Sequence, residues 1–245
     1  MHFKNRNDFL TEINSFTELG EGAQGICFLD KDKKTVYKIF HEFFDDCEPQ
    51  YCYNDIMRFS DIKNNTYMFP KNVINVNGII VGYIKPYVKS KDLTSVNPLK
   101  ISLDKLVDNI NNVRSDIEII SENGVLTYDI MYNIIYKNKI TIIDTDDYEI
   151  KDLDPIALME RNNYNFDYAI YNFLIDNIFD DFVESYRELR NMYKDKDVDV
   201  VIFIELFRKY LSEYIGFEVN KLSDAKKCMN KVKAKIPNYI RDIKL

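Results

Sequence analysis

The sequence predicts an α+β protein of two lobes, a small antiparallel β lobe with one helix over residues 1–88 and a larger, mainly helical lobe over residues 89–245. Two observations predict this division. Up to Pro86 the chain holds short runs of branched and aromatic residues between polar turns, a pattern typical of strands. After residue 98 the apolar residues recur instead at the spacing of helices.

The β lobe is expected to begin with a short helix or strand over residues 7–17, followed by a glycine-rich turn. Polar residues 30–34 form the turn of a first hairpin, and Asn77-Gly78 marks a second, because this dipeptide is the strongest short hairpin signal. The expected strands cover residues 26–29, 35–40, 73–76 and 79–84.

One helix is expected between the hairpins, over residues 49–63. Pro49 suits the first position of a helix, and Ile56, Phe59 and Ile62 give that helix an apolar stripe. Lys85-Pro86 ends the last strand of the lobe, and a connector follows.

The second lobe is expected to begin with a long helix over about residues 103–120, closed by Asn123-Gly124. Two short strands follow, over residues 134–136 and 140–143. The rest of the chain is expected to be helical, with helices over residues 165–180, 181–194, 198–214 and 222–236.

Composition excludes several classes of protein. The net charge of −7 over 245 residues argues against a nucleic-acid partner, which would need a basic face. No apolar run approaches the length that spans a bilayer, so no membrane partner is expected. Four cysteines without a C-x-x-C pair and two histidines argue against a zinc site and favour free thiols in the cytoplasm.

Three of the seven glycines in the chain, Gly20, Gly22 and Gly25, lie within six residues and fit G-x-G-x-x-G. Glycine permits positive φ and lets another group approach the backbone, and the group is usually a phosphate bound by backbone N–H groups. Because strands are expected on both sides, the turn does not fit the dinucleotide-binding fold, in which a helix follows.

The order of these features resembles the protein-kinase-like fold over residues 15–180: a glycine turn between strands, a lysine in the next strand, a helix, a hairpin, a long helix, and two aspartates around a short hairpin. The resemblance implies that ATP is bound under the glycine turn. Lys38 would pair with the α- and β-phosphates and Cys27 would pack on the adenine. The turn residues of this cofactor site are Gly20, Gly22, Ala23, Gln24 and Gly25.

In this family an acid on the next helix orients the lysine. Glu48 precedes Pro49 and lies at or outside the expected helix start. Asp55 lies in the middle of the helix and is preferred, the alternative being an exposed helix acid. The adenine edge would meet the backbone of the connector, with Val88 supplying its N–H.

The second half of the implied site begins at Asp129, which would accept the proton of the substrate hydroxyl. Asn133 follows after four residues, where the family has five, and Thr127 and Tyr128 replace the family's His and Arg. Each aspartate or asparagine has an alternative role as a turn residue.

The implied Mg²⁺ ligands are Asn133, Asp144 and Asp146. Asp144 follows an apolar strand, at the D-F-G position of the family. Three acids within four residues, Asp144 to Asp147, repel one another unless a cation neutralises part of their charge.

These features together predict an ATP- and Mg²⁺-dependent phosphotransferase acting on a protein serine or threonine hydroxyl. Two alternatives stay open: a small-molecule acceptor, aminoglycoside-like or sugar-like, and a non-catalytic ATP-binding regulator. The absence of an arginine before Asp129 argues against an activation-loop phosphate switch. The aromatic residues between 164 and 173 are interpreted as packing residues of a helix.

Overall fold

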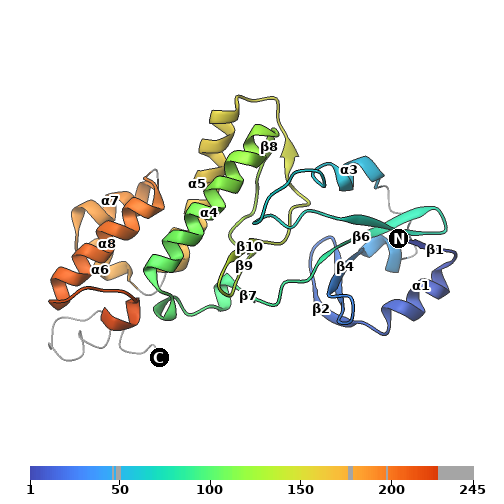
Figure 1. The fold of residues 1–245 in the computed structure, drawn as a ribbon, viewed down its shortest axis with the longest axis horizontal. Helices are drawn as coiled ribbons and strands as arrows, with labels where there is room; N and C mark the ends of the chain where they lie inside the picture. The colour runs from blue at the N-terminus through green and yellow to red at the C-terminus, as the bar shows by residue number, and fades with distance from the viewer. Residues whose placement is uncertain (46, 48–50, 176–178, 197, 226–245) are drawn as a thin grey trace. The chain divides into compact units, whose positions relative to one another are not determined.

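The computed structural model describes residues 1–225, except 46, 48–50, 176–178 and 197. The chain is α+β and divides into two compact units (Figure 1). Unit 1 consists of Met1–Lys63, Tyr67–Lys89 and Ile143–Asp146. Unit 2 consists of Asn64–Thr66, Ser90–Ile142 and the described residues from Asp147 onward. A single boundary near residue 88 would place residues 64–66 in the first unit and residues 143–146 in the second. The structure places each of these two segments in the other unit.

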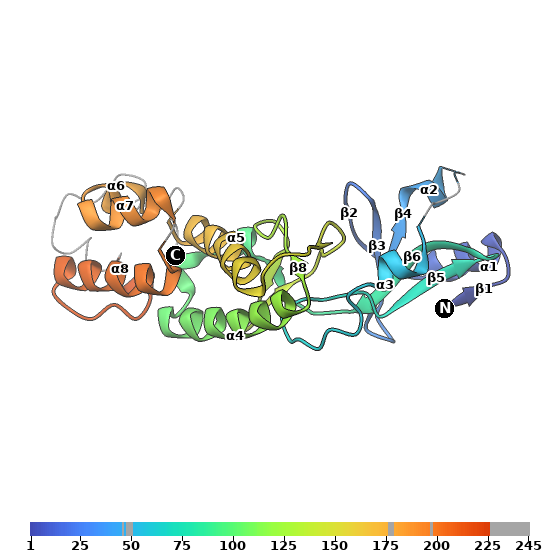
Figure 2. The ribbon, with the colours of Figure 1, turned by 90° about the horizontal axis from the view of Figure 1, so that it is seen from above.

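A six-stranded sheet forms the centre of unit 1, in the order β1-β5-β6-β4-β3-β2 (Figure 1 and Figure 2). All neighbouring strands are antiparallel except β1 and β5. The strands are β1 (His2–Phe3), β2 (Thr17–Glu21), β3 (Gly25–Asp30), β4 (Thr35–Phe40), β5 (Asn72–Val76) and β6 (Ile79–Pro86). The two predicted hairpins are thus present, and β6 ends at Lys85-Pro86, where the sequence predicted the last strand of the lobe to end.

The helices of unit 1 are short: α1 (Arg6–Ile13), α2 (His41–Phe44) and α3 (Tyr53–Met57). The helix expected over residues 49–63 is wrong in extent, and residues 48–50 lie outside the described part. Beyond Met57 the backbone forms four-residue turns, in which the Ser60 N–H donates to Met57 O at 3.0 Å and the Ile62 N–H donates to Phe59 O at 3.1 Å. Phe59 is buried against Phe69, so this part of the apolar stripe packs from a turn.

The two faces of the sheet in unit 1 carry different residues, because side chains alternate along a strand. Tyr37 and Ile39 of β4 belong to the apolar core with Phe9 and Ile13 of α1. Lys38 lies between them in β4 and faces the opposite side. The register places Cys27 of β3 and Tyr83 of β6 beside Lys38 on that side. The sheet thereby separates an apolar core from a face that carries polar residues.

Unit 2 is mainly helical, and α4 and α5 lie side by side in both views (Figure 1 and Figure 2). Its helices are α4 (Leu103–Glu122), α5 (Pro155–Ile175), α6 (Asp180–Glu184), α7 (Arg187–Asp195) and α8 (Val200–Ile215). Its short strands are β7 (Lys91–Asp92), β8 (Val125–Leu126), β9 (Ile134–Tyr136), β10 (Ile140–Ile142) and β11 (Glu149–Ile150).

The prediction that α5 begins near residue 165 is wrong by ten residues. The Asp154 side chain accepts hydrogen bonds from the backbone N–H groups of Ile156 and Ala157 (2.9 and 3.3 Å). Pro155 then occupies the first helical position, where its missing N–H costs nothing. The helix expected over residues 222–236 lies largely outside the described residues. None of the described helices is long and apolar enough to cross a membrane.

Candidate functional site

Lys38 is a buried cation at the polar face of the unit 1 sheet, with 4% of its surface exposed. Its Nζ donates to Asp146 Oδ2 at 2.5 Å and to Asp144 Oδ1 at 3.2 Å. It also donates to Gln24 Oε1 at 3.0 Å. The structure therefore brings together four residues predicted for the site, although Lys38 and Asp146 are 108 positions apart.

The segment Ile143–Asp146 is held in unit 1 by three further contacts. The Tyr83 hydroxyl donates to Asp146 Oδ1 at 2.7 Å, and Lys85 Nζ donates to the carbonyl oxygen of Ile143 at 2.5 Å. The Arg58 guanidinium donates to the backbone carbonyl oxygen of Asp146 at 2.7 Å. These contacts fix both the backbone and the carboxylate of Asp146, so the acids stand in a defined position beside Lys38.

Burial and charge oppose each other around this cluster. Burial lowers the pKa of Lys38, but the charges and hydrogen bonds of Asp146 and Asp144 outweigh burial and raise it overall. Burial lowers the pKa of Lys85 despite the same two carboxylates. Burial and the Asp146 charge raise the pKa of Tyr83, so its hydroxyl stays protonated as the donor to Asp146. The cluster thus holds two carboxylates beside a charged ammonium.

Asp55, the acid preferred from the sequence as the partner of Lys38, lies in a different environment. It is exposed on α3, and its carboxylate accepts a hydrogen bond from Cys52 Sγ at 2.8 Å. Among the described residues, the acids that form ion pairs with Lys38 are Asp144 and Asp146. The alternative acid, Glu48, lies outside the described residues.

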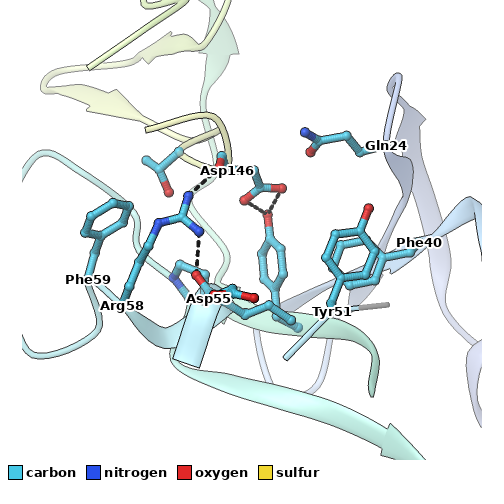
Figure 3. A pocket seen from close by; sticks show the side chains of 11 residues that line it. Gln24, Phe40, Tyr51, Asp55, Arg58, Phe59 and Asp146 are labelled. Atoms are coloured by element: carbon cyan, nitrogen blue, oxygen red, sulfur yellow. Dashed lines mark hydrogen bonds between the residues drawn. The ribbon is translucent and has the colours of Figure 1, made fainter. Parts of the chain in front are cut away.

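A cavity of about 90 Å³ lies beside the cluster, within unit 1. Figure 3 shows the Tyr51 ring stacked on Phe40, at 4.0 Å between centroids, and Asp55 on the same wall as Arg58. Pockets for drug-sized ligands usually measure about 300–1,000 Å³. The cavity is smaller than this range, so a nucleotide with its phosphates at Lys38 would extend beyond the cavity.

The glycine turn connects β2 to β3, and its glycines serve different purposes. A Cβ at Gly25 would lie 2.1 Å from Ile39 O, so a side chain there would clash with the neighbouring strand. A Cβ at Gly20 would meet open space, and one at Gly22 would make an ordinary contact with Gly25 O at 3.9 Å. The Gly22 N–H closes the turn on Gly25 O at 2.9 Å. The positive-φ glycines of the described chain lie elsewhere. The turn therefore does not use the positive φ that glycine permits, and close packing against the neighbouring strand explains Gly25.

The surroundings of the glycine turn include a residue that the sequence argument missed. His41 Nε2 lies 2.8 Å from the Gly22 carbonyl oxygen, which ties the turn to α2. Ala23 is exposed at the turn. Its position in the sequence, directly after the strand that carries Lys38, was a sign that His41 lies near the site.

Cys27 and Val88, the two residues expected to contact the adenine, lie in β3 and just after β6. Cys27 pairs in register with Lys38, and burial raises the pKa of its thiol, so the side chain remains neutral. Val88 follows β6 and is half-buried. The preceding Tyr87 N–H donates to Lys34 O at 2.8 Å, which ties the chain after β6 to the turn between β3 and β4.

Asp129 and Asn133 belong to unit 2 and share one closed turn. Asp129 has a φ of +49°, a left-handed conformation that few residues other than glycine adopt. The Asn133 side-chain amide donates to Asp129 O at 2.9 Å, and Asn133 N–H donates to Ile130 O at 3.1 Å. The four-residue interval between them is thus stabilised by Asn133 itself, while the Asp129 side chain faces solvent.

A buried asparagine of α5, also missed from the sequence, holds the segment before Asp129. Asn162 Oδ1 accepts hydrogen bonds from Thr127 N–H and Oγ1 at 2.8 and 2.9 Å. Its Nδ2 donates to Ser121 Oγ and to Val125 O. Asn162 lies four residues after the buried Leu158 and four before the buried Phe166. A polar residue at this spacing on an apolar helix face was a signal in the sequence that could have identified Asn162.

The donor set for a divalent cation is limited to a few residues. In the described part of the chain, no group of three or more His, Cys, Asp or Glu residues is placed to hold a metal ion. Asp144 and Asp146 nevertheless suit Mg²⁺, which proteins usually bind through one or two carboxylates while substrate phosphates and water complete its shell. Asn133, the third predicted ligand, belongs to unit 2.

Comparisons with known proteins add no assignment. The sequence matches no protein-family model, and no curated protein matches it either. The candidate site therefore rests on the residues described above.

Proposed function

We propose that this chain is an ATP- and Mg²⁺-dependent phosphotransferase of the protein-kinase-like superfamily, acting on a hydroxyl group, with a protein serine or threonine as the first candidate acceptor. One observation carries the proposal. Lys38, buried in a strand that follows a glycine turn, meets two carboxylates from a segment more than 100 residues later. A buried ammonium with two acids at its side is suited to bind phosphate and a divalent cation together.

The residues divide into a binding group and a proton acceptor. The Lys38 ammonium would contact the phosphates, with the glycine turn above them. Asp144 and Asp146 would hold Mg²⁺, which supplies neutralisation of the charge on the phosphate oxygens when it is bound. The exposed Asp129 carboxylate would accept the proton of the attacking hydroxyl.

A small-molecule acceptor is the second candidate, favoured by a groove of about 470 Å³ at Asp129 within unit 2. This volume lies within the range of small-ligand pockets, about 300–1,000 Å³. The third possibility, a non-catalytic nucleotide-binding regulator, is motivated by the departures of the Asp129–Asn133 interval and of Asp55 from the family pattern.

Thermal unfolding with and without ATP and Mg²⁺ tests the binding part. ATP with Mg²⁺ is expected to raise the melting temperature of the wild type but not of Lys38→Ala or Asp144→Ala. Lys31→Ala, which removes an exposed lysine of unit 1, is the control and should keep the shift. If Lys38→Ala and Asp144→Ala keep the full shift, the proposed nucleotide site is refuted.

Transfer of radiolabelled phosphate from ATP tests the catalytic part. We expect transfer to a protein or to a small hydroxyl compound by the wild type, and its loss in Asp129→Asn with nucleotide binding retained. Binding of ATP without any transfer would support the regulator. Undiminished transfer by Asp129→Asn would remove this residue from the mechanism.

A further inference from the structure

Four tyrosines of unit 2 gather around Asp129 with their rings at the surface. Tyr128 and Tyr132 come from the turn that carries Asp129, and Tyr164 and Tyr168 come from α5. Their exposed fractions lie between 37% for Tyr128 and 69% for Tyr132. Tyr164 and Tyr168 are therefore not core residues of α5, and exposed aromatic clusters of this kind mark binding surfaces.

These tyrosines line the groove of about 470 Å³ together with Ile130, Met131 and Asn165. Among the described residues that line it, Asp129 is the one with a charged side chain. The groove thus combines aromatic faces with a single negative charge. The Asp129 carboxylate and the aromatic faces both attract a cation, and the aliphatic and aromatic surface favours a carbon skeleton.

A contact at one rim of the groove already displays this chemistry. The Lys196 ammonium lies 4.9 Å from the centroid of the Tyr168 ring and 4.5 Å from that of Tyr193. Tyr168 therefore contacts an alkylammonium group of the chain itself. A ligand cation in the groove would meet the same kind of aromatic surface.

The backbone around Asp129 is held by side-chain amides on both sides. Asn165, which lines the groove, donates to Thr127 O at 2.8 Å, and Asn133 donates to Asp129 O at 2.9 Å. Between these two contacts Asp129 adopts its left-handed conformation, an uncommon state that persists when the surrounding structure holds it. The carboxylate is thereby kept at the groove.

We infer that this groove is the acceptor site for a small organic cation that carries a hydroxyl group, an amino alcohol or its quaternary form. Cation binding stands on the groove alone, whereas phosphoryl transfer rests on the proposed function with its second candidate, a small-molecule acceptor. In that transfer the hydroxyl oxygen forms a bond to the γ-phosphorus of ATP, and the bond from that phosphorus to the β–γ bridging oxygen breaks. ADP leaves, and the hydroxyl proton passes to the Asp129 carboxylate.

Calorimetry without nucleotide tests the binding, using a pair of probes that differ only in charge. Choline and 3,3-dimethyl-1-butanol have the same shape, but only choline is a cation. We expect choline to bind about tenfold more tightly than the neutral analogue, a difference of about 1.4 kcal/mol, because cation–π contacts favour the charged ligand. Ethanolamine serves as the primary amine of the same class.

Matched variants locate the binding. Tyr164→Phe keeps the aromatic face and should retain choline affinity, whereas Tyr164→Leu should lower it several-fold. Tyr53→Leu removes an exposed tyrosine of unit 1 and should change nothing. Because these side chains are exposed, all three variants should unfold near the wild-type temperature, which separates loss of binding from loss of fold.

The outcomes distinguish this inference from the proposed function. Equal affinity for choline and its neutral analogue, or failure of both choline and ethanolamine to bind, overturns the inference even if the protein phosphorylates another hydroxyl. A lysine-flanked serine peptide that binds where both amino alcohols fail overturns it in favour of a protein acceptor. Charge-selective binding that Tyr164→Leu weakens several-fold supports the inference, even if ATP is never consumed.

Discussion

Replacing Lys38 by methionine is expected to destabilise unit 1. Methionine keeps an unbranched apolar side chain in the space of the lysine but removes the ammonium that contacts two carboxylates. The Asp146 side chain is only 16% exposed, whereas that of Asp144 is 41% exposed. Removing one partner of a buried ion pair costs about 3–5 kcal/mol, and the exposure of Asp144 places the expected loss at the lower limit, about 3 kcal/mol.

Denaturation monitored by circular dichroism measures this loss, since the chain has no tryptophan. A loss of about 3 kcal/mol corresponds to a melting temperature lower by about 6–12 °C for a chain of this size. The double variant Lys38→Met with Asp146→Asn should recover a large part of the loss, because it removes the carboxylate left without its counter-charge. The control Lys31→Met, at an exposed position, should unfold like the wild type.

Two results would refute this reasoning. A Lys38→Met variant within about 0.5 kcal/mol of the wild type, the range of ordinary surface substitutions, would mean that the ion cluster contributes no net stability. Purely additive losses in the double variant would mean that Lys38 and Asp146 are not energetically coupled.

Three further predictions concern other buried polar groups. Asn162→Ala should lower the unfolding free energy by about 3 kcal/mol, because several buried partners lose a hydrogen bond. Hydrogen exchange of the Asp129 backbone amide should become faster in this variant. An unchanged exchange rate would mean that Asn162 does not hold the segment that carries Asp129. Lys85→Met should alter the unfolding free energy by less than about 1 kcal/mol, because burial of the lysine charge is itself unfavourable. The variant should still bind ATP more weakly, because the Ile143 backbone loses its hydrogen bond from Lys85. Wild-type ATP affinity in calorimetry would contradict this prediction. Burial raises the pKa of Asp167 to about 6, above its unfolded value, so its contribution favours folding at low pH and is lost as the pH rises from about 4 through 6. The difference in melting temperature between the wild type and Asp167→Asn should change over that pH window, and a constant difference would refute the shift.

The elements with a strong local pattern could be predicted from the sequence. β4 has the predicted bounds, Thr35–Phe40, and α4 begins at the predicted residue. Both succeed because alternation and helical periodicity are properties of consecutive residues. The glycine turn between two strands follows from the same local reasoning, and so does the buried lysine in the next strand.

The partners of Lys38 depended on the tertiary structure. The spacing of Asp55 on an expected helix favoured it, but α3 is only five residues long, and Asp144 and Asp146 reach Lys38 from a segment remote in sequence. Local periodicity states which residues share a face of one element but not which distant element packs against that face. Hydrogen bonds from Tyr83, Lys85 and Arg58 decide that contact.

The sequence by itself thus determined the two hairpins of the first lobe, the bounds of β4 and the start of α4, because these follow from side-chain alternation, helical periodicity and turn chemistry. Only the tertiary structure decided that Asp144 and Asp146 join the β-rich unit. Only the tertiary structure also showed that Tyr164 and Tyr168 of α5 are exposed beside Asp129. In both cases the outcome depends on which surfaces meet after the chain has folded, and neighbouring residues carry no information about that choice.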